Sequence, residues 1–370
     1  MNVLANQCEW ITRPLIEVAT LKRGYDLPVQ DRSDGPHPIF AANGTVGFHV
    51  SAKCRGPGVV TGRSGTIGKV HFVESDFWPL NTSLYVTDFH GNDPKWVYYM
   101  LQSFGLERFS QGAGVPTLNR NLIHGEPIRV PTVPEQRRIA AMLDQADVLR
   151  AKRREALAQL DSLTQSIFIE MFGDPVRNER GWPLARFGDV GTLDRGVSKH
   201  RPRNAPELLG GSHPLVQTGE VSNCDGYIRD YTHTYSDIGL RQSKIWPAGT
   251  LCITIAANIA KTGILTFDAC FPDSVVGFRA DDPATVEFVR VWLSFLQKAL
   301  EDSAPESAQK NINLAILRGL DIPTPSLPLQ QSFATRIQTL EALKSTHRTA
   351  LQELDRLFAS LQHRAFRGEL

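Results

Sequence analysis

Hydrophobic and polar positions follow a helical period in two long stretches of the chain. Apolar residues recur at alternating intervals of three and four in residues 139–167 and again in residues 333–361. Such a narrow stripe is typical of a seam that packs against another helix. The predicted seam positions are Ile139, Met142, Ala146, Leu149, Arg153, Ala156, Leu160, Leu163 and Ile167, then Phe333, Leu340, Leu343, His347, Ala350, Leu354, Leu357 and Leu361.

The ends of both helical stretches are marked in the sequence. Thr132 and Glu135 have the spacing of a capping box, and Pro134 stands in the first turn, where its missing N–H costs nothing. Ser326 and a proline repeat this start without the acid. Gly173 stops the first helix and Gly368 lies near the end of the second. We therefore predict two helices of about 39 residues, or roughly 58 Å each.

The chain contains an internal repeat. Residues 119–173 and 313–367 align at a shift of 194 without a gap and share 16 identities in 55 positions. Asn119 and Asn313 are among them. Because contacts that read different sequences should differ between copies, we predict that these two asparagines cap structure.

The segments upstream of each repeat diverge but keep a common outline. Short β-rich stretches occur at 58–61 and 67–73, and again at 249–254 and 263–267; helices are expected near 94–104 and 285–300. Because a second domain follows the first long helix, the second helix must run back along it to bury its seam. The predicted fold is α+β, with two mixed α/β domains separated by two long antiparallel coiled-coil helices in a pseudo-two-fold repeat. The predicted segments are 1–131 (first domain), 132–173 (central helix), 174–325 (second domain) and 326–370 (C-terminal helix).

Composition excludes several classes of protein. The 370 residues carry 40 Lys and Arg against 39 Asp and Glu, so a strongly basic or acidic tail is ruled out. No apolar run approaches the ~18 residues that cross a bilayer, so we expect a cytoplasmic chain without a membrane partner. The ten histidines include no H-E-x-x-H pair. Residues 62–70 resemble a phosphate loop but have Arg63 and Val70 at key positions. We therefore assign no catalytic residue, no metal site and no enzyme activity to this chain.

The order of these motifs resembles the specificity subunits of type I restriction-modification systems. The resemblance rests on Pro131-Thr-Val-Pro-Glu-Gln-Arg-Arg-Ile-Ala140, Met171-Phe-Gly-Asp-Pro175, Ser326-Leu-Pro-Leu-Gln-Gln331 and Arg364-Ala-Phe-Arg-Gly-Glu-Leu370, and it covers essentially the whole chain. Residues 61–69 and 81–83 also resemble recurrent elements of that family's target-recognition domains. Residues 62–65 of the first domain have the sequence Gly-Arg-Ser-Gly. In the second domain, residues 254–263 stand in place of this run and do not contain it.

The resemblance implies a function and partners. It implies a non-catalytic subunit that binds double-stranded DNA and chooses the sequence for a pair of methyltransferase subunits. Those partners would bind S-adenosylmethionine and methylate adenine, whereas this chain would bind no cofactor. A motor-nuclease subunit is left open as a further partner. Each domain would read one half of a bipartite target, and the helix pair would fix the gap at one to two turns of about 34 to 36 Å.

Local basic and amide-bearing segments supply candidate DNA contacts. Residues 195–203 carry four positive charges and no acid, which fits a DNA contact and also a solvated loop. The Arg63 loop fits a contact and a tight turn equally well. Since Arg, Lys, Asn and Gln read base edges and phosphates, the candidates are Asn43, Arg63, Lys69, Asn81 and Gln111 in the first domain, and Lys199, Arg201, Arg203, Thr218, Asn258, Lys261, Gln309 and Lys310 in the second.

Two alternative functions share parts of this pattern. A coiled-coil adaptor that binds proteins through both domains would show the same repeat, but it would not need two divergent domains with polar loops. A stand-alone nuclease would need a metal-binding carboxylate cluster, which the sequence does not offer.

Overall fold

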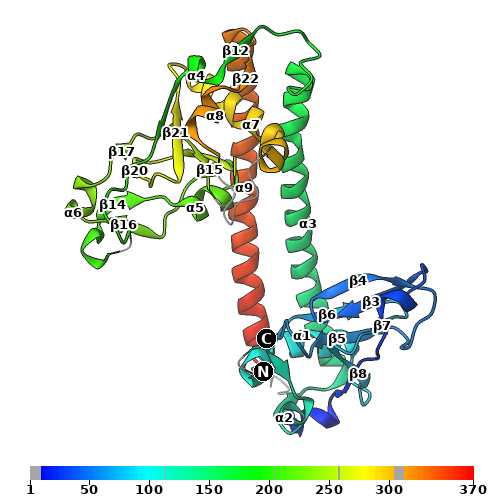
Figure 1. The fold of residues 1–370 in the computed structure, drawn as a ribbon. Helices are drawn as coiled ribbons and strands as arrows, with labels where there is room; N and C mark the ends of the chain where they lie inside the picture. Colours follow the sequence, from blue (N-terminus) through cyan, green and yellow to red (C-terminus); the bar gives the residue numbers. More distant parts are fainter. Residues whose placement is uncertain (1–9, 113, 204, 257–258, 304–311) are drawn as a thin grey trace, which may run out of the picture. The chain divides into compact units, whose positions relative to one another are not determined.

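The protein forms two units that share its two long helices. The structure, a computed structural model, describes residues 10–112, 114–203, 205–256, 259–303 and 312–370. Unit 1 comprises Met1–Glu155 and Arg348–Leu370, and unit 2 comprises Ala156–His347. Helices α3 (Val133–Phe172) and α9 (Leu327–Ala365) each contribute one half to each unit. Their lengths, 40 and 39 residues, confirm the two predicted helices, drawn in Figure 1.

Unit 1 contains small sheets and two short helices besides its halves of α3 and α9. A four-stranded antiparallel sheet has the order β2-β8-β5-β6, a three-stranded sheet has the order β4-β3-β7, and β1 pairs with β11 and β9 with β10. The bounds are β1 Ile11–Pro14, β2 Thr20–Arg23, β3 His37–Ala41, β4 Gly44–His49, β5 Gly58–Gly62, β6 Val70–Val73, β7 Trp78–Pro79, β8 Ser83–Asp88, α1 Pro94–Ser103, β9 Ser110–Gln111, β10 Thr117–Leu118, α2 Arg120–His124 and β11 Pro127–Val130.

The core of unit 1 forms where α1 packs between a sheet and the long helices. Asp93 accepts hydrogen bonds from the Lys95 and Trp96 backbone N–H groups at 3.0 and 2.9 Å, which caps α1. Every residue of β5 is buried. The same core takes in Leu143 from α3 and Phe358 from α9. This domain therefore completes its core only with segments from both long helices.

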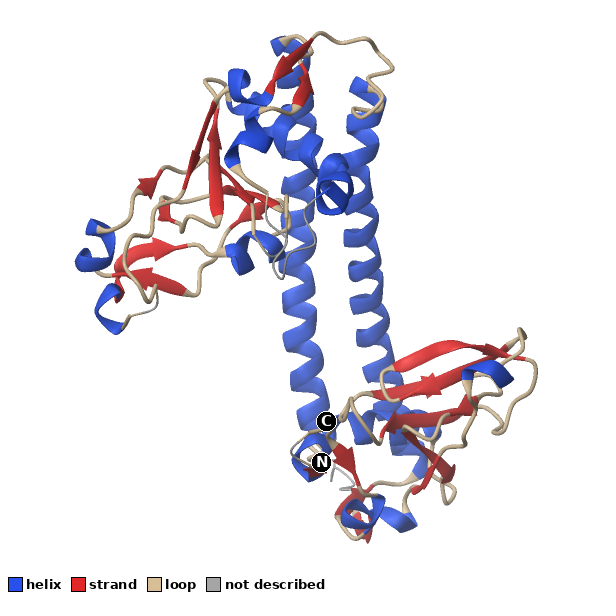
Figure 2. Ribbon diagram, in the orientation of Figure 1, coloured by secondary structure: helices blue, strands red, loops and turns tan. Residues whose placement is uncertain are grey.

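Unit 2 repeats this arrangement with more strands. Its five-stranded sheet has the order β13-β21-β18-β19-β15, its four-stranded sheet β16-β14-β20-β17, and β12 pairs with β22. In Figure 2 the strands of this unit lie beside its part of α9, with short helices among them. The bounds are β12 Leu184–Arg186, α4 Phe187–Val190, β13 Thr192–Arg195, β14 Leu209–Leu215, α5 Thr218–Asn223, β15 Tyr227–Ile228, β16 His233–Tyr235, α6 Asp237–Arg241, β17 Ile245–Trp246, β18 Leu251–Thr254, β19 Thr262–Leu265, β20 Ala269–Cys270, β21 Val275–Arg279, α7 Pro283–Ser303, α8 Leu314–Arg318 and β22 Asp321–Pro323.

Aromatic side chains hold the long helices to the unit 2 domain. Phe168 and Phe172 of α3 contact Phe333 of α9, with ring centroids 5.6 and 5.3 Å apart. Phe168 also stacks on Phe288 of α7 at 5.2 Å. These rings lie in the largest hydrophobic cluster of the unit. Mixed α/β domains on shared helices agree with the predicted α+β class.

Within each unit the halves of α3 and α9 run in opposite directions. In unit 1, Arg138 donates to the carbonyl of Leu370 at 2.9 Å, and Arg150 pairs with Asp355 at 2.6 Å. In unit 2, residue numbers likewise rise along one helix as they fall along the other: Asp161 pairs with Lys344 at 2.8 Å and Glu170 with Arg336 at 3.3 Å. Gly173 follows α3 with φ +76°, which ends the helix as predicted.

A buried glutamine marks the start of each long helix. Gln136 donates to the carbonyl of Pro131 at 3.0 Å, and the repeat-equivalent Gln330 donates to that of Pro325 at 2.8 Å. Glu135, predicted to complete a capping box, instead binds the Arg138 guanidinium. This side-chain hydrogen bond outweighs partial burial and holds the pKa of Glu135 below its usual value. The repeated Pro-x4-Gln spacing is therefore the better signal of the helix start.

Part of the predicted seam is wrong. Leu149, Leu163, Leu343 and Leu357 are exposed, with 43% to 51% of their surface accessible. Ile139 and Ala146 in α3, and Phe333 and Leu340 in α9, are buried as predicted. The other inward residues are Leu143 and Arg150 in α3 and the repeat-equivalent Ile337 and Lys344 in α9. Arg150 and Lys344 directly follow Leu149 and Leu343, so at these two points a cation with acid partners takes the inward position that was predicted for leucine.

No helix in the described ranges is long and apolar enough to cross a membrane.

Candidate nucleic-acid interfaces

Glycines shape the loop that carries Arg63 in unit 1. A Cβ on Gly62 would lie 1.7 Å from the carbonyl oxygen of Thr66, so only glycine fits there. Gly65 and Gly68 have φ of +88° and +91°. The loop is held by backbone hydrogen bonds from Arg63 to Thr82 at 2.9 Å and from Gly65 to Pro116 at 2.9 Å. The tight turn and an accessible arginine thus coexist in one loop.

An open groove of about 470 Å³ brings together two of the predicted contacts in unit 1, Arg63 and Gln111. Gln111 comes from β9 and pairs in register with Thr117 of β10, while the Arg63 loop forms another wall. The residues that line the groove are Arg23, Arg63, Leu84, Gln111, Thr117, Leu118, Asn119, Arg120 and Asn121. Among these described residues three are arginines and none is acidic. The lining suits an anionic, hydrogen-bonding ligand such as a DNA strand.

A polar network lies beside this groove. The Arg63 guanidinium donates to the carbonyl of Asn81 at 3.3 Å, and the Asn81 amide donates to Asp26. Arg23 lies 3.6 Å from the same carboxylate, in an exposed pair. Exposed pairs of this kind are weak and exchange readily with other anions. The backbone carbonyl of Asn81 thus positions Arg63, while the side-chain amide of Asn81 is bonded to Asp26.

Helix α2 sets one wall of the groove. Asn119 accepts a hydrogen bond from the backbone N–H of Asn121 at 3.0 Å, and Asn313 does the same for Ile316 at 2.9 Å in unit 2. Both predicted caps are confirmed. At the other end of α2, His124 accepts from the backbone N–H of Leu21 at 3.1 Å, an interaction that requires a neutral ring nitrogen.

In unit 2 the basic run folds around one acid. Arg201 lies 3.4 Å from the Asp273 carboxylate, and Arg203 binds its other oxygen. Arg195 donates to the backbone carbonyl of Asp273 at 2.9 Å. Arg201 also donates to the carbonyl of Ser198 at 2.6 Å. One carboxylate leaves the three arginines with a net positive charge, so the run forms an ordered cationic loop.

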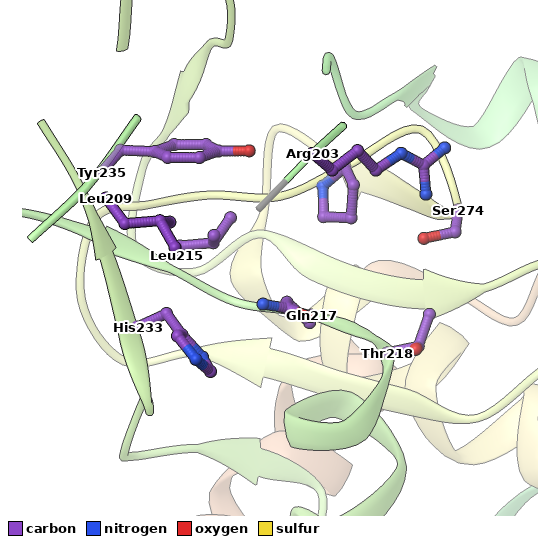
Figure 3. A pocket seen from close by; sticks show the side chains of 9 residues that line it. Arg203, Leu209, Leu215, Gln217, Thr218, His233, Tyr235 and Ser274 are labelled. Atoms are coloured by element: carbon purple, nitrogen blue, oxygen red, sulfur yellow. The ribbon is translucent and has the colours of Figure 1, made fainter. Parts of the chain in front are cut away.

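A pocket of about 170 Å³ joins this loop to the second sheet of unit 2. In Figure 3, Arg203 and Ser274 lie at one end, Tyr235 and two leucines at the other, and Gln217, Thr218 and His233 along a third side. Glu220 accepts from the backbone N–H of Gln217 at 3.0 Å, which fixes the start of α5. The pocket therefore brings together Arg203 and Thr218 from the predicted set.

The other predicted residues are not gathered in these sites. Asn43, Lys69 and Lys199 are exposed, and Lys261 is partly buried. Asn258, Gln309 and Lys310 lie outside the described residues. Lys199 does lie in the cationic loop, where its backbone N–H donates to the Gln242 side chain at 2.7 Å. For Asn43 and Lys69, exposure of the residue is thus the one observation that fits the predicted role as a DNA contact.

Sequence reasoning missed several residues that line the two sites. Arg23 and Arg120 flank the groove, and Gln217, His233 and Ser274 line the pocket. Arg120 directly follows the capping Asn119, so its place beside a recurring cap was a usable signal. The others come from separate strands and loops, and only the folded sheet brings them together.

The described residues contain no group of three or more His, Cys, Asp or Glu side chains that could hold a metal ion.

Comparisons with known proteins agree with this architecture. The E. coli type I restriction enzyme EcoBI specificity subunit is 28% identical over 143 residues, which are 36% of this chain and 30% of the relative. The E. coli EcoprrI specificity subunit is 26% identical over 114 residues, 30% of this chain and 28% of the relative. The chain thus matches less than a third of the length of either protein. An S subunit structure from a type I restriction-modification system of M. genitalium has a TM-score of 0.62 at 17% identity, covering 99% of this chain and 98% of that one.

The family model described as the type I restriction modification DNA specificity domain matches residues 8–159 and again residues 179–356. The two matches in tandem cover most of the sequence, and each spans one domain and part of the long helix that follows it. The chain belongs to the family of type I restriction-modification DNA specificity proteins.

Proposed function

We propose that this chain is the DNA sequence-recognition subunit of a type I restriction-modification complex, in which each domain reads one half of a bipartite target. The observation that carries the proposal is that the two domains share the strand order of one sheet but have different polar residues at their surfaces. The order β2-β8-β5-β6 in unit 1 corresponds to β13-β21-β18-β19 in unit 2. On this shared framework, unit 1 offers an arginine-rich groove and unit 2 a cationic loop beside a pocket.

In this proposal the long helices form an antiparallel coiled coil that sets the distance between half-sites. The 40 residues of α3 correspond to roughly 60 Å at 1.5 Å per residue. A DNA turn measures about 34 to 36 Å, so the half-sites would be one to two turns apart. Support comes from the contacts in both units, where α3 and α9 run in opposite directions.

The catalytic chemistry belongs to partner subunits in this proposal. A pair of methyltransferase subunits would bind S-adenosylmethionine and reach the target adenine by flipping it out of the duplex. Their docking surface would include the exposed Leu149 and Leu163 and the repeat-equivalent Leu343 and Leu357. Because the repeat supplies the same apolar residues twice, two copies of one partner could bind alike. A motor-nuclease subunit would be a further partner.

The experiment is to map methylation by the complex with single arginine variants. The chain is co-expressed with its methyltransferase subunit, and the methylated sites of the host genome are sequenced. We expect Arg63→Ala to relax one half-site and Arg203→Ala the other, with a loss of about 1 to 3 kcal/mol in binding if each contacts a base. Arg177→Ala is the matched control, since this arginine is 75% exposed and lies outside both sites.

Other outcomes would favour other functions. Unchanged half-sites in both variants would remove Arg63 and Arg203 from the interface. An assembled complex that neither methylates nor binds a defined sequence would support a protein adaptor instead. DNA cleavage by the purified chain alone would revive the stand-alone nuclease.

A further inference from the structure

In unit 1, one inward-facing cation of α3 lies between two acids. Arg150 binds Asp147 of its own helix at 2.7 Å and Asp355 of α9 at 2.6 Å. Its side chain is 18% exposed, and its guanidinium lies 4.2 Å from the ring centroid of Phe358. Phe358 in turn contacts Tyr99 of α1, with ring centroids 6.1 Å apart. This Arg150 cluster therefore joins both helices to the recognition domain of unit 1.

Unit 2 contains the same arrangement. Lys344 of α9 binds Glu341 of its own helix at 3.2 Å and Asp161 of α3 at 2.8 Å. Its side chain is only 3% exposed. Glu341 also binds Arg229 at 3.0 Å. Arg229 directly follows β15 in the recognition domain. This Lys344 cluster joins both helices to the recognition domain of unit 2.

The two clusters occupy equivalent positions of the sequence repeat. The shift of 194 residues carries Arg150 to Lys344 and Asp147 to Glu341. It also relates Asp161 to Asp355, so each copy supplies the acid that the other copy's cation needs. The residue type differs at Arg150/Lys344 and at Asp147/Glu341, but the charge is the same, so the chain has kept the same contact twice.

Apolar packing does little to align the helices along this stretch. Between Ala146 and Phe168 of α3, and between Leu340 and Phe358 of α9, Lys344 is the one residue with less than a tenth of its surface exposed. A seam of half-buried aliphatic side chains tolerates more than one alignment. A buried cation that needs an acid partner on the other helix allows only the alignment that brings the two together, because an unpaired buried cation is strongly unfavourable.

The sequence also disfavours the neighbouring alignments. A shift of α9 by one heptad would place Arg348 or Gln362 opposite Arg150 in place of Asp355. The same shifts would replace Asp161, opposite Lys344, by Arg154 or Phe168. In both alternatives neither cation would face a cross-helix acid.

We propose that the Arg150 and Lys344 clusters are positioning residues that hold α3 and α9 in one alignment, and thereby restrict the complex to one spacer between its half-sites. This inference rests on the proposed function. A misalignment of one heptad corresponds to about 10 Å along the helix, or about three base pairs of DNA. Loss of the clusters should therefore change the spacer and leave the half-sites unchanged.

The test compares Arg150→Met/Lys344→Met with the charge-preserving Arg150→Lys/Lys344→Arg in the assembled methyltransferase complex. Methylation is measured on a DNA library in which both half-sites are fixed and the spacer varies. We expect the methionine variant to lose at least about tenfold in discrimination between spacers, because apolar side chains do not fix the alignment. The charge-preserving variant should retain the wild-type spacer. Glu170→Gln, which removes an exposed cross-helix pair with Arg336, is the matched control and should change nothing.

Thermal unfolding separates positioning from simple stabilisation. The methionine variant removes only the cations, but the acids that remain are mostly solvated: Asp147, Asp355 and Asp161 are 36% to 51% exposed, and Glu341 keeps its pair with Arg229. We therefore expect a relaxed spacer with little change in melting temperature. If the methionine variant does not fold, Asp161→Asn/Asp355→Asn is measured on the same library. A folded variant of either kind with the wild-type spacer preference overturns the inference. Failure of the wild-type complex to select a bipartite site would instead overturn the proposed function.

Discussion

His124 links the candidate groove to solution pH. Its ring accepts the Leu21 N–H and so anchors α2 to β2. Burial, with a smaller effect from Arg120, lowers the pKa of His124 below its ordinary value of 6.5. As the pH falls, the unfolded chain therefore binds a proton before the folded one does. The contribution of His124 to stability is complete above about pH 6.5 and is lost as the pH falls toward the lower folded pKa.

We therefore expect the melting temperature to fall on acidification from about pH 7.5 to 5.5, and to fall less in His124→Gln. The glutamine amide can accept the Leu21 hydrogen bond but does not titrate in this range. His71, whose pKa burial also lowers, should contribute to the pH dependence that remains in both proteins. Identical pH profiles for the two proteins would show that His124 does not anchor α2 by this hydrogen bond.

A buried glutamine lies at the start of each long helix, but the two glutamines differ in their hydrogen-bond partners. Gln136 donates to Pro131 and to Asn92, at 2.7 Å for the latter, and accepts from the backbone N–H of Asp93 at 2.8 Å. Gln330 makes the equivalent bond to Pro325, but its buried amide oxygen has no partner in the described part of the chain. The first helix is therefore joined to α1 through its glutamine, which the second is not.

We expect Gln136→Ala to destabilise the protein by about 2 to 4 kcal/mol, since it leaves buried groups of the α1 start unpaired. Gln330→Ala should cost only about 1 kcal/mol, because it removes one hydrogen bond and one unsatisfied oxygen. Urea unfolding of the two variants checks the order. Equal losses would mean that the contact with α1 adds nothing to helix capping.

For the whole molecule, assembly depends on surfaces that the fold leaves exposed. Leu149 and Leu163 are 51% and 43% exposed, so exchanging them for aspartate should not disturb the core. We expect Leu149→Asp/Leu163→Asp to weaken binding of the methyltransferase subunit by at least about tenfold, at an unchanged melting temperature. Val29→Asp is the matched control, since Val29 is 74% exposed and belongs to neither helix. Co-purification at wild-type yield would exclude these leucines from the docking surface.

Local features of this molecule were predictable from sequence, and long-range ones were not. The caps at Asn119 and Asn313 and the end of α3 at Gly173 depend on neighbouring residues only. The pairing of Arg201 with Asp273 joins residues 72 positions apart, and no periodicity reveals it. Leu149 was misplaced for the same reason, because the inward position of Arg150 depends on an acid in the other helix.

The discontinuity of unit 1 has a consequence for synthesis. Phe358 and Ala365 belong to the core that also holds Trp96 and Leu143. A nascent chain emerging from the ribosome therefore exposes an unfinished amino-terminal core until residues 348–370 have been translated. Unit 2 is continuous in sequence and can fold in the meantime. The half made first is thus the half completed last.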